Sequence, residues 1–203
     1  MNDIYRLCLV TDRGLAPAGR SLTDIVAAAV RGGVTMVQLR EKEATTRDFL
    51  EQARALKALL ALLRIPLVIN DRVDIALAVD ADGVHAGQGD MPVAQVRALI
   101  GPDKIIGLSI TNAKQIRQPE ATLADYLGIG PVFVQTTKSD AAQPLGIAGF
   151  AALRALAAKP VIAIGGVKAE HAIALRQAGA DGLAVVSAIM ASADAEAAAR
   201  RFG

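Results

Sequence analysis

Short apolar runs alternate with helical segments along the whole of this 203-residue chain, and this alternation limits the fold more than any other feature. We interpret the runs as eight strands, at residues 7–10, 35–39, 67–69, 83–85, 104–107, 125–130, 161–164 and 182–186. A helix follows each strand, which predicts a parallel sheet with right-handed crossovers. Eight such units close into a (β/α)8 TIM barrel, and the alternative is an open, doubly wound sheet. Among the helices, we expect one over residues 111–118 and a last, Ala-rich one after Ser187.

The composition fits one TIM-barrel domain over residues 1–203. Apolar residues make up 53% of the chain but aromatic residues only 3%, so the core must consist of Ala, Val, Leu and Ile. Such a core suits helices layered on a parallel sheet. The length suits one domain, and neither a linker nor a low-complexity segment divides the sequence.

Charge and cysteine content exclude several kinds of partner. A net charge of +2 and few aromatic residues argue against binding to nucleic acid. The single cysteine, Cys8, lies in an apolar run, where we interpret it as buried filler in a protein of the reducing cytoplasm. No apolar run is long enough to span a bilayer, and the N-terminus lacks the pattern of a signal peptide. We expect a cytoplasmic protein that binds small molecules, and leave open whether it forms a homo-oligomer.

Polar side chains gather where the second strand ends. If the strand geometry continues to residue 42, Gln38, Arg40 and Lys42 point the same way. One amide and two cations suit an anion, above all a phosphate or diphosphate. The competing interpretation is a solvated strand end without a ligand.

Other strands also end in polar residues, and the active site of a TIM barrel lies at these carboxyl ends. They include Asn70, Asp71, Asp90, Ser109, Thr136, Thr137, Lys138 and Ser187. Asp71 and Asp90 follow adjacent strands and suit either Mg²⁺ or general acid–base chemistry. The alternatives are a helix cap for Asp90 and a surface pair with Arg72 for Asp71.

A second anion site is indicated at the ends of strands seven and eight. Gly165 and Gly166 follow strand seven, and Ser187 follows strand eight. In barrels this region commonly binds phosphate through backbone N–H groups. The segment 135–142 is either a lid between the two anion sites or a long surface loop.

The chain has two histidines, and neither forms a triad with Cys8 or a serine. His85 ends a buried strand and is either a core histidine, which we favour, or a site residue. His171 is expected at the surface. We therefore discount nucleophilic hydrolysis.

Several motifs, taken in order, resemble the thiamine phosphate synthase family over nearly the whole chain. They are LVTDR (9–13), VQLREK (37–42), INDR (69–72), DGVHAGQGD (82–90), GLS (107–109), DYLGIGPVF (125–133), TTKSDAA (136–142), AIGGV (163–167) and GLAVVSAI (182–189). The resemblance implies a transferase of thiamine biosynthesis that condenses hydroxymethylpyrimidine diphosphate with hydroxyethylthiazole phosphate. It implies release of diphosphate, dissociative chemistry through a pyrimidine carbocation, and Mg²⁺ as cofactor.

The resemblance also implies roles for individual residues. Arg40, Lys42, Asn70 and Lys138 would hold the diphosphate, with Ser109 nearby, and Arg40, Lys42, Ser109 and Lys138 would be the catalytic residues. Asp71 and Asp90 would hold Mg²⁺, and Gln38 would contact the pyrimidine. Thr137, Gly166 and Ser187 would hold the thiazole phosphate, with Gln135, Thr136 and Val186 beside them.

Two positions depart from the family pattern. Gln135 replaces a threonine, and Thr111 stands where a histidine is frequent. Because of these departures, a related TIM-barrel enzyme, a thiazole tautomerase, is an alternative assignment. That enzyme has no need of a metal–diphosphate site. A regulator that binds a phosphorylated ligand and a barrel enzyme acting on a phosphorylated sugar are further alternatives. Both leave the diphosphate residues unexplained.

Overall fold

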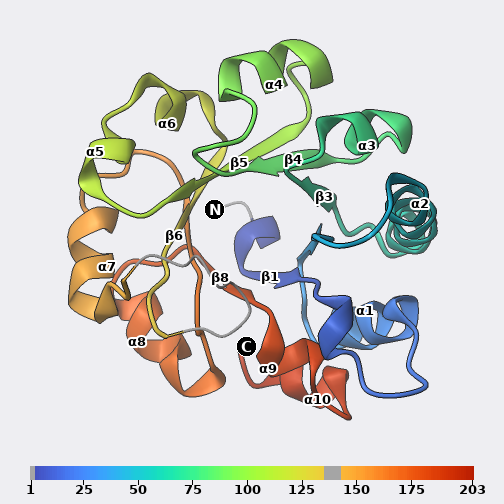
Figure 1. The fold of residues 1–203 in the computed structure, drawn as a ribbon. Helices are drawn as coiled ribbons and strands as arrows, with labels where there is room; N and C mark the ends of the chain where they lie inside the picture. Colours follow the sequence, from blue (N-terminus) through green and yellow to red (C-terminus); the bar gives the residue numbers. More distant parts are fainter. Residues whose placement is uncertain (1–2, 135–142) are drawn as a thin grey trace.

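The computed structural model describes residues 3–134 and 143–203, and the strands in this part of the chain form a closed barrel (Figure 1). The strands are β1 (Leu7–Val10), β2 (Met36–Leu39), β3 (Leu67–Asn70), β4 (Gly83–Ala86), β5 (Ile105–Ile110), β6 (Tyr126–Ile129), β7 (Val161–Ala163) and β8 (Gly182–Val185). Each is parallel to its neighbour, and β8 pairs with β1 through Cys8 opposite Ala184. The predicted (β/α)8 barrel is therefore confirmed, and the open sheet is excluded.

Helices form a ring outside the strands (Figure 1). They are α1 (Leu22–Arg31), α2 (Thr46–Leu63), α3 (Val73–Ala78), α4 (Val93–Ile100), α5 (Ala113–Ile116), α6 (Pro119–Leu123), α7 (Gly146–Arg154), α8 (Ala172–Gln177), α9 (Ser187–Met190) and α10 (Ala195–Arg200). The two longest helices, α1 and α2, have hydroxyl side chains as N-caps. Ser21 Oγ accepts the Asp24 N–H, and Thr45 Oγ1 accepts the Asp48 N–H. No helix in the described ranges is long and apolar enough to cross a membrane.

Two helix predictions are corrected by local capping. The helix expected at 111–118 begins only at Ala113, because the Asn112 side chain caps it, and Pro119 starts the separate helix α6. The last helix is likewise divided, since Asp194 caps α10 by accepting the Ala197 N–H. This second piece packs closely on the end of α1, where a Cβ at Gly32 would lie 2.3 Å from the Glu196 carbonyl oxygen.

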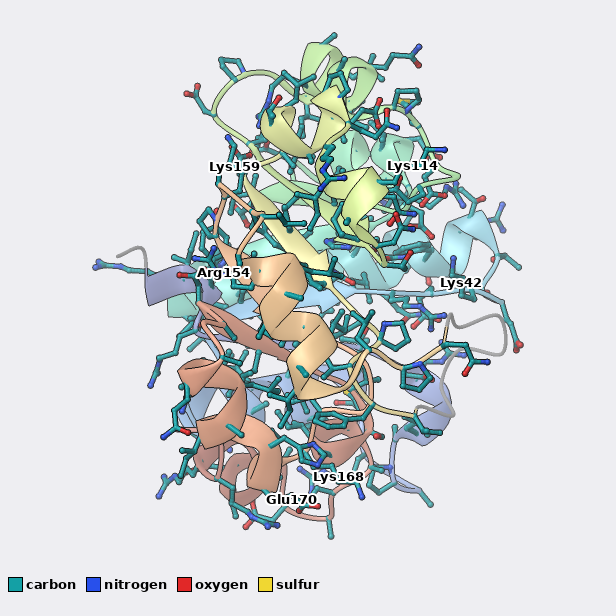
Figure 2. The ribbon with its side chains drawn as sticks, turned by 90° about the vertical axis from the view of Figure 1, so that its left-hand side faces the viewer. Lys42, Lys114, Arg154, Lys159, Lys168 and Glu170 are labelled. Carbon is teal, nitrogen blue, oxygen red and sulfur yellow. The ribbon has the colours of Figure 1, made fainter. Side chains whose placement is uncertain are left out.

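Aspartates stabilise the amino-terminal end of the barrel at alternate strands. Asp82, Asp125 and Asp181 each precede a strand and accept a backbone N–H at the start of the neighbouring strand, from Leu67, Ile106 and Val161 respectively, at 2.8–2.9 Å. Each also forms an ion pair, with Lys57, Arg97 and Arg154 respectively. Figure 2 shows Arg154 and Lys159 toward this end and Lys42 toward the opposite one. One end of the barrel is thus tied together by ion pairs, which leaves the other for the site.

The barrel interior is a core of its own. Tyr5, Cys8, Met36, Val68, Tyr126, Ile162 and Ala184 pack there. The 3₁₀ helix η1 (Asp3–Tyr5) lies within the ring of strands in Figure 1, and the Tyr5 ring centroid is 5.2 Å from that of Tyr126. Burial raises the pKa of the Cys8 thiol to about 12, so this cysteine is an inert packing residue, as expected.

Candidate active site

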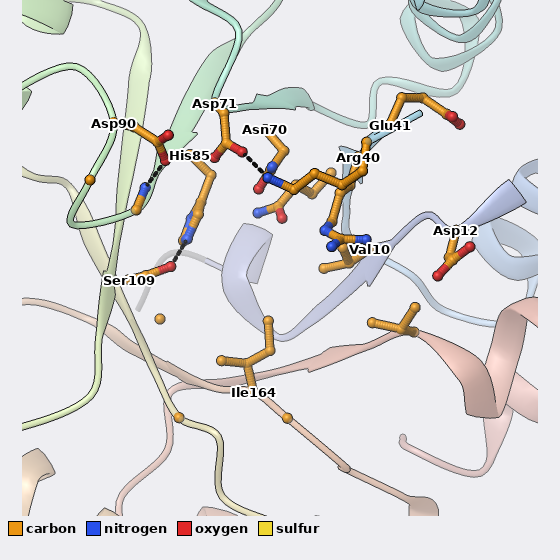
Figure 3. A pocket seen from close by; sticks show the side chains of 18 of the residues that line it. Val10, Asp12, Arg40, Glu41, Asn70, Asp71, His85, Asp90, Ser109 and Ile164 are labelled. Atoms are coloured by element: carbon orange, nitrogen blue, oxygen red, sulfur yellow. Dashed lines mark hydrogen bonds and ion pairs between the residues drawn. The ribbon is translucent and has the colours of Figure 1, made fainter. Parts of the chain in front are cut away.

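A pocket of about 1240 Å³ opens at the carboxyl ends of the strands (Figure 3). Eight of the predicted site residues line it: Gln38, Arg40, Lys42, Asn70, Asp71, Asp90, Ser109 and Val186. Gly166 and Ser187 do not line it, but each is adjacent in the chain to a residue that does, Gly165 and Val186. Gln135, Thr136, Thr137 and Lys138 lie outside the described residues, as does the predicted lid.

The end of β2 is shaped by a residue that sequence reasoning missed. The strand stops at Leu39, so its alternation does not continue through Arg40 to Lys42, although both side chains reach the pocket. Thr11, which is fully buried, accepts the Arg40 N–H at 3.0 Å and donates its own N–H to the Gln38 carbonyl at 2.9 Å. A polar residue at the end of an apolar strand was the only signal for this role.

A cation and two carboxylates meet at one side of the pocket (Figure 3). The Lys42 ammonium lies 2.6 Å from Asp71 Oδ2. The Asp71 backbone is left-handed, with φ 62°, and its N–H donates to the His85 carbonyl at 2.8 Å. Burial raises the pKa of Asp90, and hydrogen bonding to the Asp71 carboxyl raises it further. Both carboxyl groups line the same pocket.

The alternatives for these aspartates are wrong. Asp90 does not cap α4, whose N-cap is Pro92; it closes a turn by accepting the Gly87 N–H at 2.7 Å. Arg72 does not pair with Asp71, because its guanidinium lies 2.6 Å from Asp74. Both carboxylates are left facing the pocket.

His85 is a satisfied core histidine that also lines the pocket. Its Nδ1 lies 2.8 Å from the Tyr126 hydroxyl, and its Nε2 lies 2.9 Å from Ser109 Oγ. Burial lowers the pKa of His85 to about 4, against a smaller opposing effect of Asp90. Ser109 lies inside β5, which runs further than predicted, and this places its hydroxyl on the pocket wall.

The end of β7 requires glycine at two successive positions. Gly165 and Gly166 have φ values of 93° and 66°. A Cβ would lie 2.5 Å from Pro131 Cα at the first position and 2.5 Å from the Val134 carbonyl oxygen at the second. The β7 exit is thus pressed against the segment that follows β6. Nearby, His171 is half-buried rather than free at the surface, with its ring stacked on Phe133 at 3.8 Å between centroids.

A closed barrel with a polar pocket at the carboxyl ends of its strands defines the class of TIM-barrel enzymes. The family described as "Thiamine monophosphate synthase" matches residues 7–189. Relatives named thiamine-phosphate synthase, from Chloroflexus aurantiacus and Syntrophomonas wolfei, are each 51% identical; they match 98% and 100% of this chain and 91% and 96% of their own. This chain therefore belongs to the thiamine-phosphate synthase family of transferases, and the resemblance found in the sequence is confirmed.

Solved structures agree with this assignment. Thiamine phosphate pyrophosphorylase from Pyrococcus furiosus superposes with a TM-score of 0.87 at 36% identity, covering 98% of this chain and 94% of that one. A 3-hexulose-6-phosphate synthase superposes at 0.68 with 17% identity, which reflects the barrel fold alone.

Proposed function

We propose that this protein condenses hydroxymethylpyrimidine diphosphate with hydroxyethylthiazole phosphate, yielding thiamine phosphate and diphosphate. The observation that carries the proposal is the ion pair of Lys42 with Asp71 on the wall of a pocket that Asp90 also lines. A cation beside paired carboxylates suits a metal-bound diphosphate. A site for a monophosphate alone would not need this arrangement.

The proposed diphosphate site is formed by the ends of β2, β3 and β5. Arg40 and Lys42 supply positive charge, Asn70 an amide, and Ser109 a hydroxyl, all on the pocket wall. Lys138, the fourth proposed catalytic residue, lies outside the described residues. Positive charge here stabilises the negative charge that develops on the leaving diphosphate.

The donor set fits Mg²⁺. Asp71 and Asp90 are adjacent carboxyl groups whose mutual repulsion a cation would relieve. Among the described residues no three His, Cys, Asp or Glu side chains form a metal site, and Mg²⁺ characteristically takes one or two carboxylates and completes its shell with phosphate oxygens and water. When bound, the ion would act as a Lewis acid on the diphosphate.

The proposed thiazole-phosphate site lies on the other side of the pocket. Gly165 and Val186 line the pocket there, beside Gly166 and Ser187. The left-handed glycines leave the main chain free of side chains, so backbone N–H groups can approach a phosphate closely. Gln135, Thr136 and Thr137 complete this proposed site beyond the described residues. Gln38 is proposed to contact the pyrimidine.

In the proposed mechanism the bond between the pyrimidine methylene carbon and the diphosphate oxygen breaks first, and the electron pair leaves with the diphosphate. The thiazole nitrogen then bonds to the methylene carbon, so no proton has to be transferred. The protein orients both substrates and excludes water from the carbocation. This chemistry needs no protein nucleophile, in keeping with a buried Cys8 and a hydrogen-bonded Ser109.

The test is to mix the purified protein with both substrates and Mg²⁺ and to measure thiamine phosphate by its fluorescence after oxidation. We expect product that disappears with a chelator and returns with Mg²⁺. Folded protein that makes no product would overturn the proposal. Aromatisation of a thiazole precursor would then identify a tautomerase, and binding without turnover a regulator.

We also propose that the protein is cytoplasmic and binds neither nucleic acid nor membranes, which its charge and lone buried cysteine support. Light scattering measures whether the protein forms a homo-oligomer.

A further inference from the structure

We infer that His85 is a positioning residue: a directed hydrogen-bond chain from Tyr126 through His85 turns the Ser109 hydroxyl into a fixed donor that faces the pocket. None of the roles proposed above involves His85 or Tyr126. The chain would make one wall of the pocket recognise a hydrogen-bond acceptor on the bound substrate.

The chain crosses three neighbouring strands. His85 lies on β4, Ser109 on β5 and Tyr126 on β6. The Tyr126 hydroxyl is 2.8 Å from His85 Nδ1. On the other side of the ring, His85 Nε2 is 2.9 Å from Ser109 Oγ (Figure 3). His85 and Tyr126 are buried, with 5% and 2% of their surface exposed, whereas Ser109 is only half-buried. The chain therefore leads from the barrel interior to the pocket.

Burial and bonding set the direction of the chain. Within the described ranges the His85 ring has two hydroxyl groups as hydrogen-bond partners and no carboxylate, so no counter-charge contacts the buried ring directly and the ring is neutral. Burial raises the pKa of the Tyr126 phenol well above its usual value, so it keeps its proton. Among the described residues, the acceptor within hydrogen-bond distance of the buried Tyr126 hydroxyl is His85 Nδ1, and a buried hydroxyl hydrogen without an acceptor is costly. Tyr126 therefore donates its proton to His85 Nδ1.

The remaining protons follow from the chemistry of a neutral imidazole. If Nδ1 accepts from Tyr126, Nε2 carries the proton and donates to Ser109 Oγ. The Ser109 oxygen is then an acceptor within the protein, and its hydrogen needs another partner. Among residues 3–134 and 143–203, no acceptor for this hydroxyl is present apart from the His85 ring. The Ser109 proton is therefore available to a ligand in the pocket.

The barrel makes room for this chain with glycines. A Cβ at Gly107 would lie 2.2 Å from Tyr126 Cζ and 2.4 Å from His85 Nδ1. At Gly128 it would lie 3.1 Å from His85 Cε1. The two rings are packed at 5.5 Å between centroids and hold each other in place. A donor oriented before the ligand arrives costs no reorganisation on binding.

The direct test is the tautomer of His85, and it needs no substrate. With ¹⁵N-labelled imidazoles at neutral pH, we expect a protonated Nε2 and an unprotonated Nδ1. The chain has two histidines, so in the His171→Gln variant all imidazole ¹⁵N signals belong to His85. In Tyr126→Phe we expect the two tautomers to mix. A proton on Nδ1, or on both nitrogens, would overturn the inference whatever reaction the protein catalyses.

A double-mutant cycle tests the route through Ser109, and this arm rests on the proposed function. His85→Met removes the N–H donor, whereas His85→Gln keeps an amide near the Nε2 position. We expect His85→Met to lower kcat/KM for the pyrimidine diphosphate by about tenfold, the effect of one hydrogen bond. His85→Gln should retain most of the wild-type kcat/KM, and KM for the thiazole phosphate should be unchanged in both variants.

In a Ser109→Ala background, His85→Met should lower kcat/KM for the pyrimidine diphosphate by less than about twofold, because the hydroxyl that His85 positions is gone. Effects that multiply in full would show that His85 acts by another route. A wild type without synthase activity would instead count against the proposed function, and the tautomer measurement would still decide the inference.

Discussion

The Lys42 ammonium lies 2.6 Å from Asp71 Oδ2, so the ends of β2 and β3 are joined by an ion pair at the side of the pocket. Lys42 is 52% exposed and Asp71 is 22% exposed. An exposed pair of this kind contributes little to folding, about 0–1 kcal/mol. Its position at the proposed metal and diphosphate site is the more telling property.

Replacing Lys42 should therefore impair catalysis and leave stability nearly unchanged. We expect Lys42→Ala to lower kcat/KM about 100-fold, as for other single groups that stabilise a developing negative charge. Diphosphate release in steady state measures the first effect and urea unfolding the second. The matched control is Lys57→Ala, which breaks a 2.8 Å pair with Asp82 at the other end of the barrel. That variant should keep full activity. Equal losses of activity in the two variants would contradict the assignment.

Asp71→Asn should abolish Mg²⁺-dependent diphosphate release while the protein stays folded. Asparagine is the informative replacement because Asp71 has φ 62°, a conformation that Asn adopts readily and Ala does not. Activity is measured over a Mg²⁺ titration and folding by circular dichroism. Asp80→Asn is the control, since Asp80 is also left-handed, with φ 49°, and pairs with Lys104 away from the pocket. An inactive but unfolded Asp71→Asn protein would point to a structural carboxylate.

Gly107→Ala should destabilise the barrel through steric overlap. The new methyl group would lie 2.2 Å from Tyr126 Cζ, within a packed interior. We expect a loss of about 3 kcal/mol in the free energy of unfolding, at the upper end for overpacking. Gly89→Ala is the control, because its Cβ would have no neighbour within 4 Å. Similar stability of the two variants would mean that the Tyr126 and His85 rings shift easily.

His85 should make the protein less stable in mild acid. Its pKa is about 4 in the folded protein, against 6.5 for an ordinary solvated histidine, so between these values the unfolded chain binds a proton that the folded chain does not. Stability from this group is complete above about pH 6.5 and falls as the pH drops toward 4, by about 3 kcal/mol in all. Urea unfolding at pH 7 and 4.5, for the wild type and His85→Gln, isolates the effect. A variant with the same pH dependence as the wild type would refute it.

Sequence periodicity predicted the barrel because a parallel strand buried on both faces leaves a local signature. Leu7–Val10 is found at the predicted bounds, since an apolar run that ends in a polar turn carries its own boundaries. The polar ends of strands pointed to Lys42, Asp71 and Asp90 for the same reason: the carboxyl ends of all eight strands meet at one place.

Contacts between strands could not be predicted in this way. Thr11 holds Arg40 from 29 residues away in sequence, and Tyr126 reaches His85 across 41. Nothing near Tyr126 in the sequence marks it as the partner of a histidine. The left-handed backbone at Asp71, which brings its carboxylate to Lys42, was equally invisible.

The sequence by itself determined the class of fold, the end of the barrel that carries the pocket, and eight of the residues that line it. These depend on local periodicity and on the point where each strand ends. Only the tertiary structure decided which side chains touch: that Lys42 pairs with Asp71, and that His85 joins Tyr126 to Ser109. The physical reason is that hydrogen bonds and ion pairs depend on distances of about 3 Å, and closure of the barrel sets those distances between residues far apart in the chain.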